Sequence, residues 1–446
     1  MIKYKHDILV WMKTDIKKFL KGKKMFENLR KKIEADAEGF LDPKEKERFI
    51  KCFFNTLETT CKFQEDGSVF VITGDIPAMW LRDSAAQVMQ YLYYVDDLEV
   101  QSLIKGVLKR QFQMILIDSY SNAFMLDETY KSEWDGMVTT DYLPKIVWER
   151  KFEVDSLCYP LFLLSKYFDK TGDKEVLDEL FVKAFDKILE TFEKERKHSE
   201  RSTYFFHFYR EEDGDTEDAG DNDPKTEKGL IWSGFRPSDD LCKYPYHIPD
   251  NMFVVSVLCK MQWIFKNQLN DTIRAERCKE LSEGLRKLIE KYGIVETEYG
   301  KGYVSETDCL GNYTLADDAN IPSLLSLPYL EYPYLNEEIY QNTRKRVLSK
   351  DNMYYYEGKI LKGIGSPHTP ANRVWPLAVA MQGITSKCKE EIKDCYKMLI
   401  SSDNGTGYMH ESIDVDDPSI FSRPWFAWAN SLFAYFVLKN KDVLTE

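Results

Sequence analysis

Apolar residues recur at helical spacing along most of the chain. The clearest runs cover residues 100–108, 176–192, 281–289 and 392–399. In each run an apolar side chain returns every three or four positions, which places these side chains on one face of a helix. We therefore predict a mainly helical protein with roughly ten to thirteen helices.

Strand patterns are few and short. Residues 69–72, 203–209 and 353–356 are rich in β-branched and aromatic side chains, which is typical of small hairpins. The acidic stretch 211–228 is interpreted as a surface loop, and no linker divides the chain. We predict one domain over residues 1–446, with residues 1–44 forming a helical extension packed on it.

Long polar loops separate the predicted helices. They contain Trp, Arg and Asp and cover residues 73–83, 133–142, 232–250, 316–320, 365–373 and 405–417. A helical toroid would gather such loops at one end of a central cavity. An open solenoid with a concave face is the alternative, but the chain shows no fixed repeat, and this argues against a solenoid.

Charge and cysteine content narrow the class of protein. The chain has 61 basic and 74 acidic residues and a net charge of −13, which argues against nucleic acid and anionic membranes as partners. Its nine cysteines show no CxxC spacing and indicate reduced thiols. The apolar run 8–12 is too short for a signal peptide or a membrane span. We predict a cytoplasmic protein.

Two acidic segments carry the strongest signs of chemistry. Residues 407–433 place Glu411 beside His410, followed by further acids, an Arg and two Trp, and residues 232–240 end in Asp239 and Asp240. A pair of carboxylates can protonate a leaving oxygen and activate water, and indole rings stack on sugars. We interpret the two segments as halves of a carbohydrate-processing site. Alternatively, Asp239 or Asp240 caps the next helix and Glu411 forms a structural ion pair.

A third segment, 73–87, predicts a loop followed by a helix that begins near Asp83 or Ser84. Arg82 and Asp83 stand side by side. Because Arg donates in a rigid fork and Asp accepts, the pair could bind vicinal hydroxyls. The alternative is a helix N-cap with a stabilising Arg.

Metal and nucleotide motifs are missing from the sequence. His410 and Glu411 begin an HExxH pattern, but Asp414 stands where the second His belongs, and no two His residues are four apart. No P-loop, strand-linked GxGxxG or GxSxG motif is present. We therefore predict neither a metal site nor a cofactor.

Six long motifs follow one another between about residues 45 and 440. They are TGDIPAMWLRDSAAQV (73–88), ERKFEVDSLCYP (149–160), WSGFRPSDD (232–240), DDANIPSLLSLPYL (317–330), GSPHTPANRVWPL (365–377) and MHESIDVDDPSIFSRPWFAWANSLF (409–433). In sequence and in order these motifs resemble the family 125 glycoside hydrolases.

The resemblance implies an all-α fold, an (α/α)6 toroid of twelve helices with small β-hairpins in its loops. It also implies exo-acting, metal-independent hydrolysis of α-1,6-linked mannose from the non-reducing end of an oligosaccharide, with inversion. The general acid would be Asp239 or Asp240, with Asp239 favoured, and the general base Glu411. The implied substrate-binding residues are Trp80, Arg82, Asp83, Asp155, Arg236, Asp317, Asp318, His368, Arg373, His410 and Trp425.

Three other activities fit the same residues. A phosphorylase or transglycosidase would need an anion pocket in place of the water. An epimerase would use His residues as acid and base, and His368 and His410 are the candidates. A non-catalytic carbohydrate-binding protein would tolerate the loss of both acids.

Overall fold

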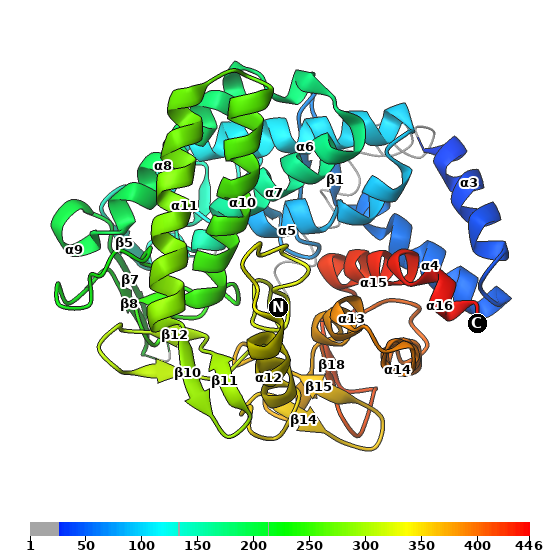
Figure 1. Ribbon diagram of the computed structural model, residues 1–446. Helices are drawn as coiled ribbons and strands as arrows, with labels where there is room; N and C mark the ends of the chain where they lie inside the picture. Colours follow the sequence, from blue (N-terminus) through cyan, green and yellow to red (C-terminus); the bar gives the residue numbers. More distant parts are fainter. Residues whose placement is uncertain (1–25, 133, 213) are drawn as a thin grey trace.

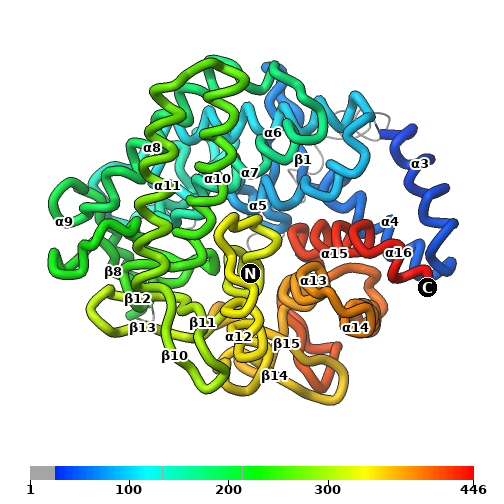
Figure 2. Tube along the Cα trace, in the orientation of Figure 1, coloured from blue at the N-terminus to red at the C-terminus, as the bar shows by residue number. Residues whose placement is uncertain are grey.

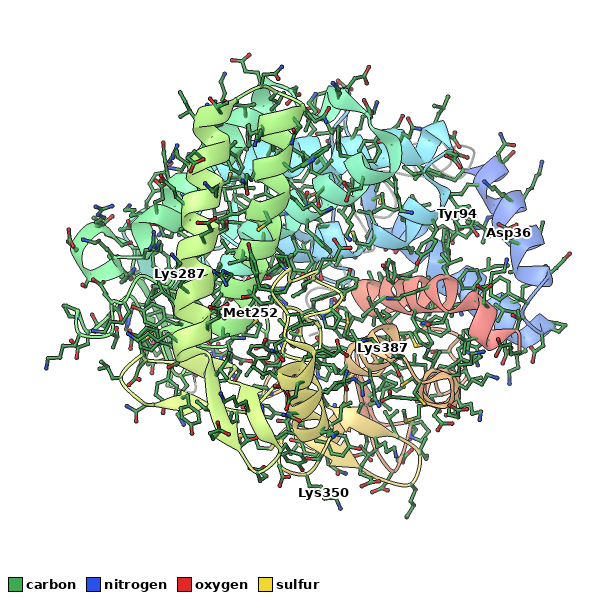
Figure 3. The ribbon with its side chains drawn as sticks, in the orientation of Figure 1. Asp36, Tyr94, Met252, Lys287, Lys350 and Lys387 are labelled. Atoms are coloured by element: carbon green, nitrogen blue, oxygen red, sulfur yellow. The ribbon has the colours of Figure 1, made fainter. Side chains whose placement is uncertain are left out.

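The computed structural model describes residues 26–132, 134–212 and 214–446 (Figure 1). Residues 1–25 of the predicted extension lie outside the described residues. The rest of that extension contains α3 (Glu27–Glu38), which packs on α4 (Pro43–Asn55). Tyr94 donates a hydrogen bond from its hydroxyl to Asp36 of α3 at 3.2 Å, and both residues are labelled in Figure 3. This bond ties α3 to the body of the protein.

One set of helices forms the centre of the molecule. The set consists of α5 (Leu81–Ala86), the 3-10 helix η2 (Met89–Tyr94), α7 (Val154–Thr171), α10 (Ile248–Asn267), α13 (Pro376–Thr385) and α15 (Ala427–Lys439). Each packs on the next: α13 on α15, α15 on η2 and α5, α5 on α7, and α7 on α10. The turns of residues 321–335 join this set, since Tyr329 contacts Phe162 of α7 and Tyr435 of α15.

A second set alternates with the first along the chain and lies around it (Figure 2). It consists of α4, α6 (Leu98–Ile117), α8 (Glu179–Glu195), α11 (Thr272–Tyr292), α12 (Glu337–Val347) and α14 (Lys389–Ser401). On α11, Leu285 is buried while Lys287 is exposed, whereas Met252 on the neighbouring α10 is fully buried (Figure 3). The outer helices are therefore amphipathic and the central ones are apolar on most sides.

The remaining helical pieces are short. They are the π-helix η1 (Thr56–Thr60), the 3-10 turn η3 (Lys174–Val176), α9 (His198–Arg201) and α16 (Lys441–Leu444). None of the helices in the described ranges is both long and apolar enough to cross a membrane.

In the described part of the chain, seven small antiparallel sheets lie in the loops. Three are hairpins: β1 (Cys61–Phe63) with β2 (Val69–Val71), β10 (Ile294–Thr297) with β11 (Gly300–Tyr303), and β14 (Tyr355–Glu357) with β15 (Lys362–Ile364). The other four have three strands each. Their strand orders are β3 (Ala78–Trp80), β4 (Ala123–Met125), β6 (Val147–Glu149); β5 (Val138–Thr140), β7 (Phe206–Arg210), β8 (Asp215–Ala219); β13 (Tyr313–Thr314), β12 (Glu306–Thr307), β9 (Tyr246–His247); and β16 (Arg373–Val374), β17 (Ser412–Asp414), β18 (Phe421–Ser422).

The prediction of a mainly helical chain with small hairpins in its loops is confirmed. The runs 100–108, 281–289 and 392–399 lie in α6, α11 and α14, and all three proposed hairpin segments contain a strand.

Two predicted segments were wrong in part. The run 176–192 does not form one helix, because Asp178 accepts the Phe181 N–H at 2.8 Å and caps α8 from Glu179 onward. The acidic stretch 211–228 is not only a loop, since β8 lies within it and pairs with the aromatic strand β7.

Candidate active site

The predicted site segments lie at the N-terminal ends of central helices. Short strands lead into α5, α7, α10 and α13, and β17 and β18 precede α15. Asp83 and Asp155 lie in the first turns of α5 and α7. The partial positive charge of a helix N-terminus stabilises such carboxylates.

Helix α5 begins at Leu81, and not near Asp83 or Ser84 as the sequence suggested. The N-cap interpretation of Asp83 is therefore wrong. The carboxylate of Asp83 instead accepts a hydrogen bond from the Thr73 hydroxyl at 2.8 Å.

Arg82 lies at the centre of a buried group of carboxylates. Its Nη1 donates to Glu153 Oε2 at 2.7 Å and to Asp155 Oδ2 at 3.1 Å. Its Nη2 donates to Asp239 Oδ1 at 3.0 Å. The guanidinium thus holds an acid from the 232–247 loop against the start of α7, and its donors are directed at protein carboxylates.

Burial and these contacts shift the pKa values of the carboxylates in opposite directions. Burial raises the pKa of Glu153 well above its ordinary value and that of Asp155 to about 7, although Arg82 opposes both shifts. Burial acts on Asp239 in the same sense, but the charge of Arg82 and a hydrogen bond with Glu153 lower its pKa to about 2. The group thus shifts the pKa of Glu153 upward and that of Asp239 downward.

The two adjacent acids of the 232–240 segment face different partners. Asp239 has a left-handed backbone with φ of 65°, and its carbonyl accepts Lys151 Nζ at 2.8 Å. Asp240 accepts the Ser238 hydroxyl at 2.6 Å, and its Oδ1 lies 3.9 Å from His368 Nδ1. One acid is thus directed to Arg82 and the other to His368. Neither caps α10, whose N-cap is His247.

His368 connects the two acidic halves of the site. Its side chain is 42% exposed. Desolvation alone would lower its pKa, but the adjacent Asp240 carboxylate and the charges of Asp239 and Glu411 raise it to about 9. His368 is therefore an imidazolium at neutral pH, and carboxylates from positions 239, 240 and 411 act on it together.

Glu411 is also buried, with 9% of its surface exposed. Arg423 Nη1 lies 3.4 Å from Glu411 Oε1, and Arg423 also pairs with Asp75. Sequence reasoning did not single out Arg423, Asp75 or Glu153. Each lies inside a recognised motif, so the motif itself was the available signal.

A second polar chain surrounds Arg236. Its Nε lies 3.7 Å from Glu306 Oε1. Burial alone would lower the pKa of Arg236, but the charges of Asp318, Glu306 and Asp240 raise it above its usual value. Nearby, His247 Nδ1 lies 3.0 Å from Asp250 Oδ2. Glu306, His247 and Asp250 were not predicted, since only the folded chain brings them to Arg236.

Two other predicted residues, Asp317 and His410, make contacts within the protein that leave their polar atoms occupied. Asp317 accepts the Leu324 and Leu325 N–H groups at 2.8 and 3.1 Å. His410 is fully buried; its ring stacks on Phe421 at 3.8 Å, and Nδ1 contacts the Arg423 carbonyl. The structure does not bring these two side chains into the acidic group.

Three further predicted residues lie in the surrounding loops. Trp80 is 6% exposed and packs with Trp148, and its indole N–H has no hydrogen-bond partner among the described residues. Arg373 is half-buried in β16. Trp425 is half-buried against Gly74, where an added Cβ would lie 3.1 Å from its ring.

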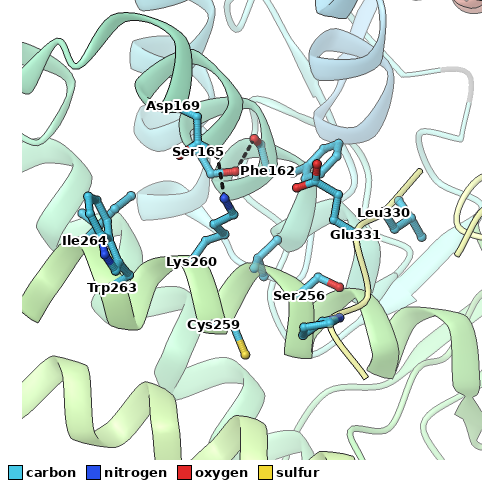
Figure 4. Close-up of a pocket in the computed structure, with 12 residues that line it drawn as sticks. Phe162, Ser165, Asp169, Ser256, Cys259, Lys260, Trp263, Ile264, Leu330 and Glu331 are labelled. Carbon is cyan, nitrogen blue, oxygen red and sulfur yellow. Dashed lines mark hydrogen bonds and ion pairs between the residues drawn. The ribbon is translucent and has the colours of Figure 1, made fainter. Parts of the chain in front are cut away.

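Two hollows lie apart from the acids. One, of about 360 Å³, lies between α7 and α10, where Lys260 pairs with Asp169 at 2.7 Å (Figure 4). The other, of about 690 Å³, lies beside the β7–β8 hairpin. Neither contains Asp239, Asp240 or Glu411. Within the described ranges, no group of three or more His, Cys, Asp or Glu side chains could hold a metal ion.

Comparisons with known proteins agree with a carbohydrate site. A family model described as metal-independent alpha-mannosidase (GH125) matches residues 42–438. The Meiotically up-regulated gene 157 protein of Schizosaccharomyces pombe is 38% identical over 412 residues, covering 87% of this chain and 81% of that protein.

Solved structures give the same result. A metal-independent α-mannosidase of Streptococcus pneumoniae, in a non-productive complex with α-1,6-mannobiose, is 40% identical, with a TM-score of 0.87 over 94% of this chain and 99% of that one. A bacterial glucoamylase with acarbose shares only the fold, at 12% identity and a TM-score of 0.57, over 91% of this chain and 58% of that one. Because the family model spans most of the chain and two relatives match it nearly end to end, the chain belongs to the metal-independent α-mannosidases of glycoside hydrolase family 125.

Proposed function

We propose that this protein is an exo-acting α-mannosidase that removes α-1,6-linked mannose from the non-reducing end of an oligosaccharide with inversion. The observation that carries the proposal is the convergence of Asp239, Asp240 and Glu411 on His368. The 40% identical relative bound to α-1,6-mannobiose supports the linkage. The alternation of central and outer helices supports an (α/α)6 toroid as the scaffold.

The proposed reaction is a single displacement. Asp239, once protonated, gives its proton to the glycosidic oxygen as the bond from that oxygen to the anomeric carbon breaks. A water attacks the opposite face of the sugar, and Glu411 accepts a proton from it. The products are free mannose of inverted configuration and the shortened oligosaccharide. An inverting site leaves roughly 6.5–9.5 Å between its carboxyl groups so that the water fits.

Several neighbours would hold the sugar and the two acids. The imidazolium of His368 can donate to a hydroxyl, and Asp240 beside it can accept from one. Arg423 fixes Glu411 to the loop before α5, and Arg82 fixes Asp239 to α7. These contacts orient both acids before substrate arrives, which is what efficient acid–base catalysis requires.

The decisive experiment follows α-1,6-mannobiose by proton NMR. We expect mannose to be released with the β-anomer appearing first, before mutarotation. First appearance of the α-anomer would contradict inversion, and no release of mannose would contradict the activity. The α-1,2- and α-1,3-linked disaccharides are the matched controls for linkage. Product formation that requires phosphate would instead indicate a phosphorylase, and solvent deuterium uptake without hydrolysis an epimerase.

We also propose a cytoplasmic location. All nine cysteines are free and five are buried, which suits a reducing compartment. Fractionation of cells that carry the native protein tests this location, and recovery from an exported fraction would contradict it.

A further inference from the structure

The carboxylates around Arg82 exceed the positive charge available to them. Glu153, Asp155 and Asp239 all lie within 3.1 Å of the one guanidinium, and Asp83 lies 3.8 Å from its Nε. The Arg82 side chain is only 3% exposed. An unpaired buried charge is very costly, so a group of this composition retains protons at neutral pH.

Glu153 is better placed than Asp239 to retain a proton. The Glu153 side chain is fully buried, whereas that of Asp239 is 25% exposed. Glu153 Oε2 accepts Arg82 at 2.7 Å and the Ser156 hydroxyl at 3.0 Å, and Oε1 accepts the Asn122 amide at the long distance of 3.4 Å. Its burial disfavours the charged form, while partial exposure and Arg82 favour the charged form of Asp239.

Charged and titratable groups surround Glu153 directly or through one neighbour. Arg82 of α5, Asp155 of α7, and Asp239 and Cys242 of the loop before α10 act on it directly. Asp83 reaches it through Arg82, and Glu149 at the end of β6, which pairs with Lys151, reaches it through Asn122. Two of these groups, Arg82 and Lys151, are cations. Among these groups, Asp239 is hydrogen-bonded to Glu153 and keeps 25% of its side chain exposed.

Resting on the proposed function, we propose that Glu153 is a positioning residue that shares one proton with Asp239 and so supplies the general acid. In each turnover the shared proton passes from Glu153 to Asp239 and then to the glycosidic oxygen. The proton that Glu411 takes from the attacking water leaves to solvent, and solvent returns one proton to the Glu153–Asp239 pair. The net reaction is hydrolysis, and the enzyme neither gains nor loses a proton over one turnover.

The proposal has a distinct consequence for pH dependence. A coupled pair with one proton keeps a constant fraction of protonated Asp239 until the pair itself loses that proton. With Gln at position 153 the amide cannot carry the proton, and Asp239 must take it from solvent. Because Arg82 and Lys151 hold the pKa of Asp239 low, its protonated fraction then falls about tenfold for each pH unit.

The test measures kcat/KM on α-1,6-mannobiose from pH 4 to pH 9 for the wild type, Glu153→Gln and Glu195→Gln. Glu195 is the matched control, because it is also a fully buried Glu with a hydrogen bond, from the Tyr120 hydroxyl at 2.5 Å, yet it contacts neither Arg82 nor Asp239. We expect Glu153→Gln to move the alkaline limb to lower pH by about one unit or more. We expect Glu195→Gln to keep the wild-type shape. A uniform loss at every pH in Glu153→Gln would mean a merely structural role and would overturn the proposal.

A second measurement does not depend on activity. Infrared spectra in deuterated buffer at neutral pD report protonated carboxyl groups by their C=O stretch. We expect Glu153→Gln and Asp239→Asn each to lose part of this band, since Glu153 ionises when its anionic partner is removed. An unchanged band in both variants refutes the shared proton. If Asp239→Asn keeps full mannosidase activity while losing the band, the acid assignment fails and the shared proton stands.

Discussion

Arg423 fixes Glu411 to a distant part of the chain. Its Nη1 lies 3.4 Å from Glu411 Oε1, while its Nη2 donates to the Thr73 carbonyl at 3.1 Å and pairs with Asp75. The loop before α15 is thus joined to the loop before α5. A carboxylate held in this way has one preferred orientation, as a base that aligns an attacking water requires.

Replacing Glu411 by Gln removes the base and keeps the size of the side chain. We expect kcat to fall about 10²–10⁴-fold, the usual contribution of a general base. Binding of α-1,6-mannobiose, measured by calorimetry, should remain close to wild type because the amide still fills the site. A variant that turns over at near the wild-type rate would exclude Glu411 as the base.

Asp239→Asn and Asp240→Asn separate the two candidate acids. A general acid matters most for a poor leaving group, so losing it should slow mannobiose far more than an aryl mannoside with an acidic phenol. We expect this pattern for Asp239→Asn, and a higher KM on both substrates for Asp240→Asn. Asn suits the left-handed backbone at position 239, so folding should be preserved. The reverse pattern would make Asp240 the acid.

His368 should make stability depend on pH. Its pKa is raised from 6.5 to about 9 in the folded protein, despite partial burial, by the adjacent Asp240 carboxylate and by Asp239 and Glu411. Its contribution is therefore fully present below about pH 6.5 and is lost as pH rises through 9. Melting temperatures from pH 6 to pH 10 should fall more steeply for the wild type than for His368→Gln. Equal slopes would show that the imidazolium contributes nothing to folding.

The outer helices were predictable because each has a polar face. In α11 and α14 apolar residues return at helical spacing between charged ones. The central α10 is buried along most of its length, so its apolar residues form no stripe, and it was not recognised from periodicity. Strands of two residues, such as β9, are set by pairing with distant segments and leave no local pattern.

The acids themselves were predictable, but their partners were not. Asp239, Asp240 and Glu411 stand out because they lie among Arg and aromatic residues in short motifs. Glu153 gives no such signal, since its meaning depends on Arg82, which lies 71 positions earlier in the chain. The charge balance of a buried cluster depends on tertiary contacts. These contacts cannot be predicted from the local pattern of a single sequence.

Gly365 is the position where one added methyl group should disturb the site without touching an acid. It follows β15, and a Cβ there would lie 2.2 Å from the Arg373 carbonyl and 2.9 Å from the Tyr356 ring. The backbone cannot yield cheaply, so Gly365→Ala should destabilise the protein by about 1–3 kcal/mol. It should also displace His368, which lies three residues later, and raise KM.

Gly39→Ala is the matched control for this substitution. Gly39 has an ordinary φ of −77°, and its nearest atom to an added Cβ is the Asp36 carbonyl oxygen at 3.4 Å. We expect its melting temperature to equal or slightly exceed that of the wild type, because Ala restricts the unfolded chain. If Gly365→Ala has the same melting temperature as Gly39→Ala and an unchanged KM, the close approach of β15 to β16 does not position His368.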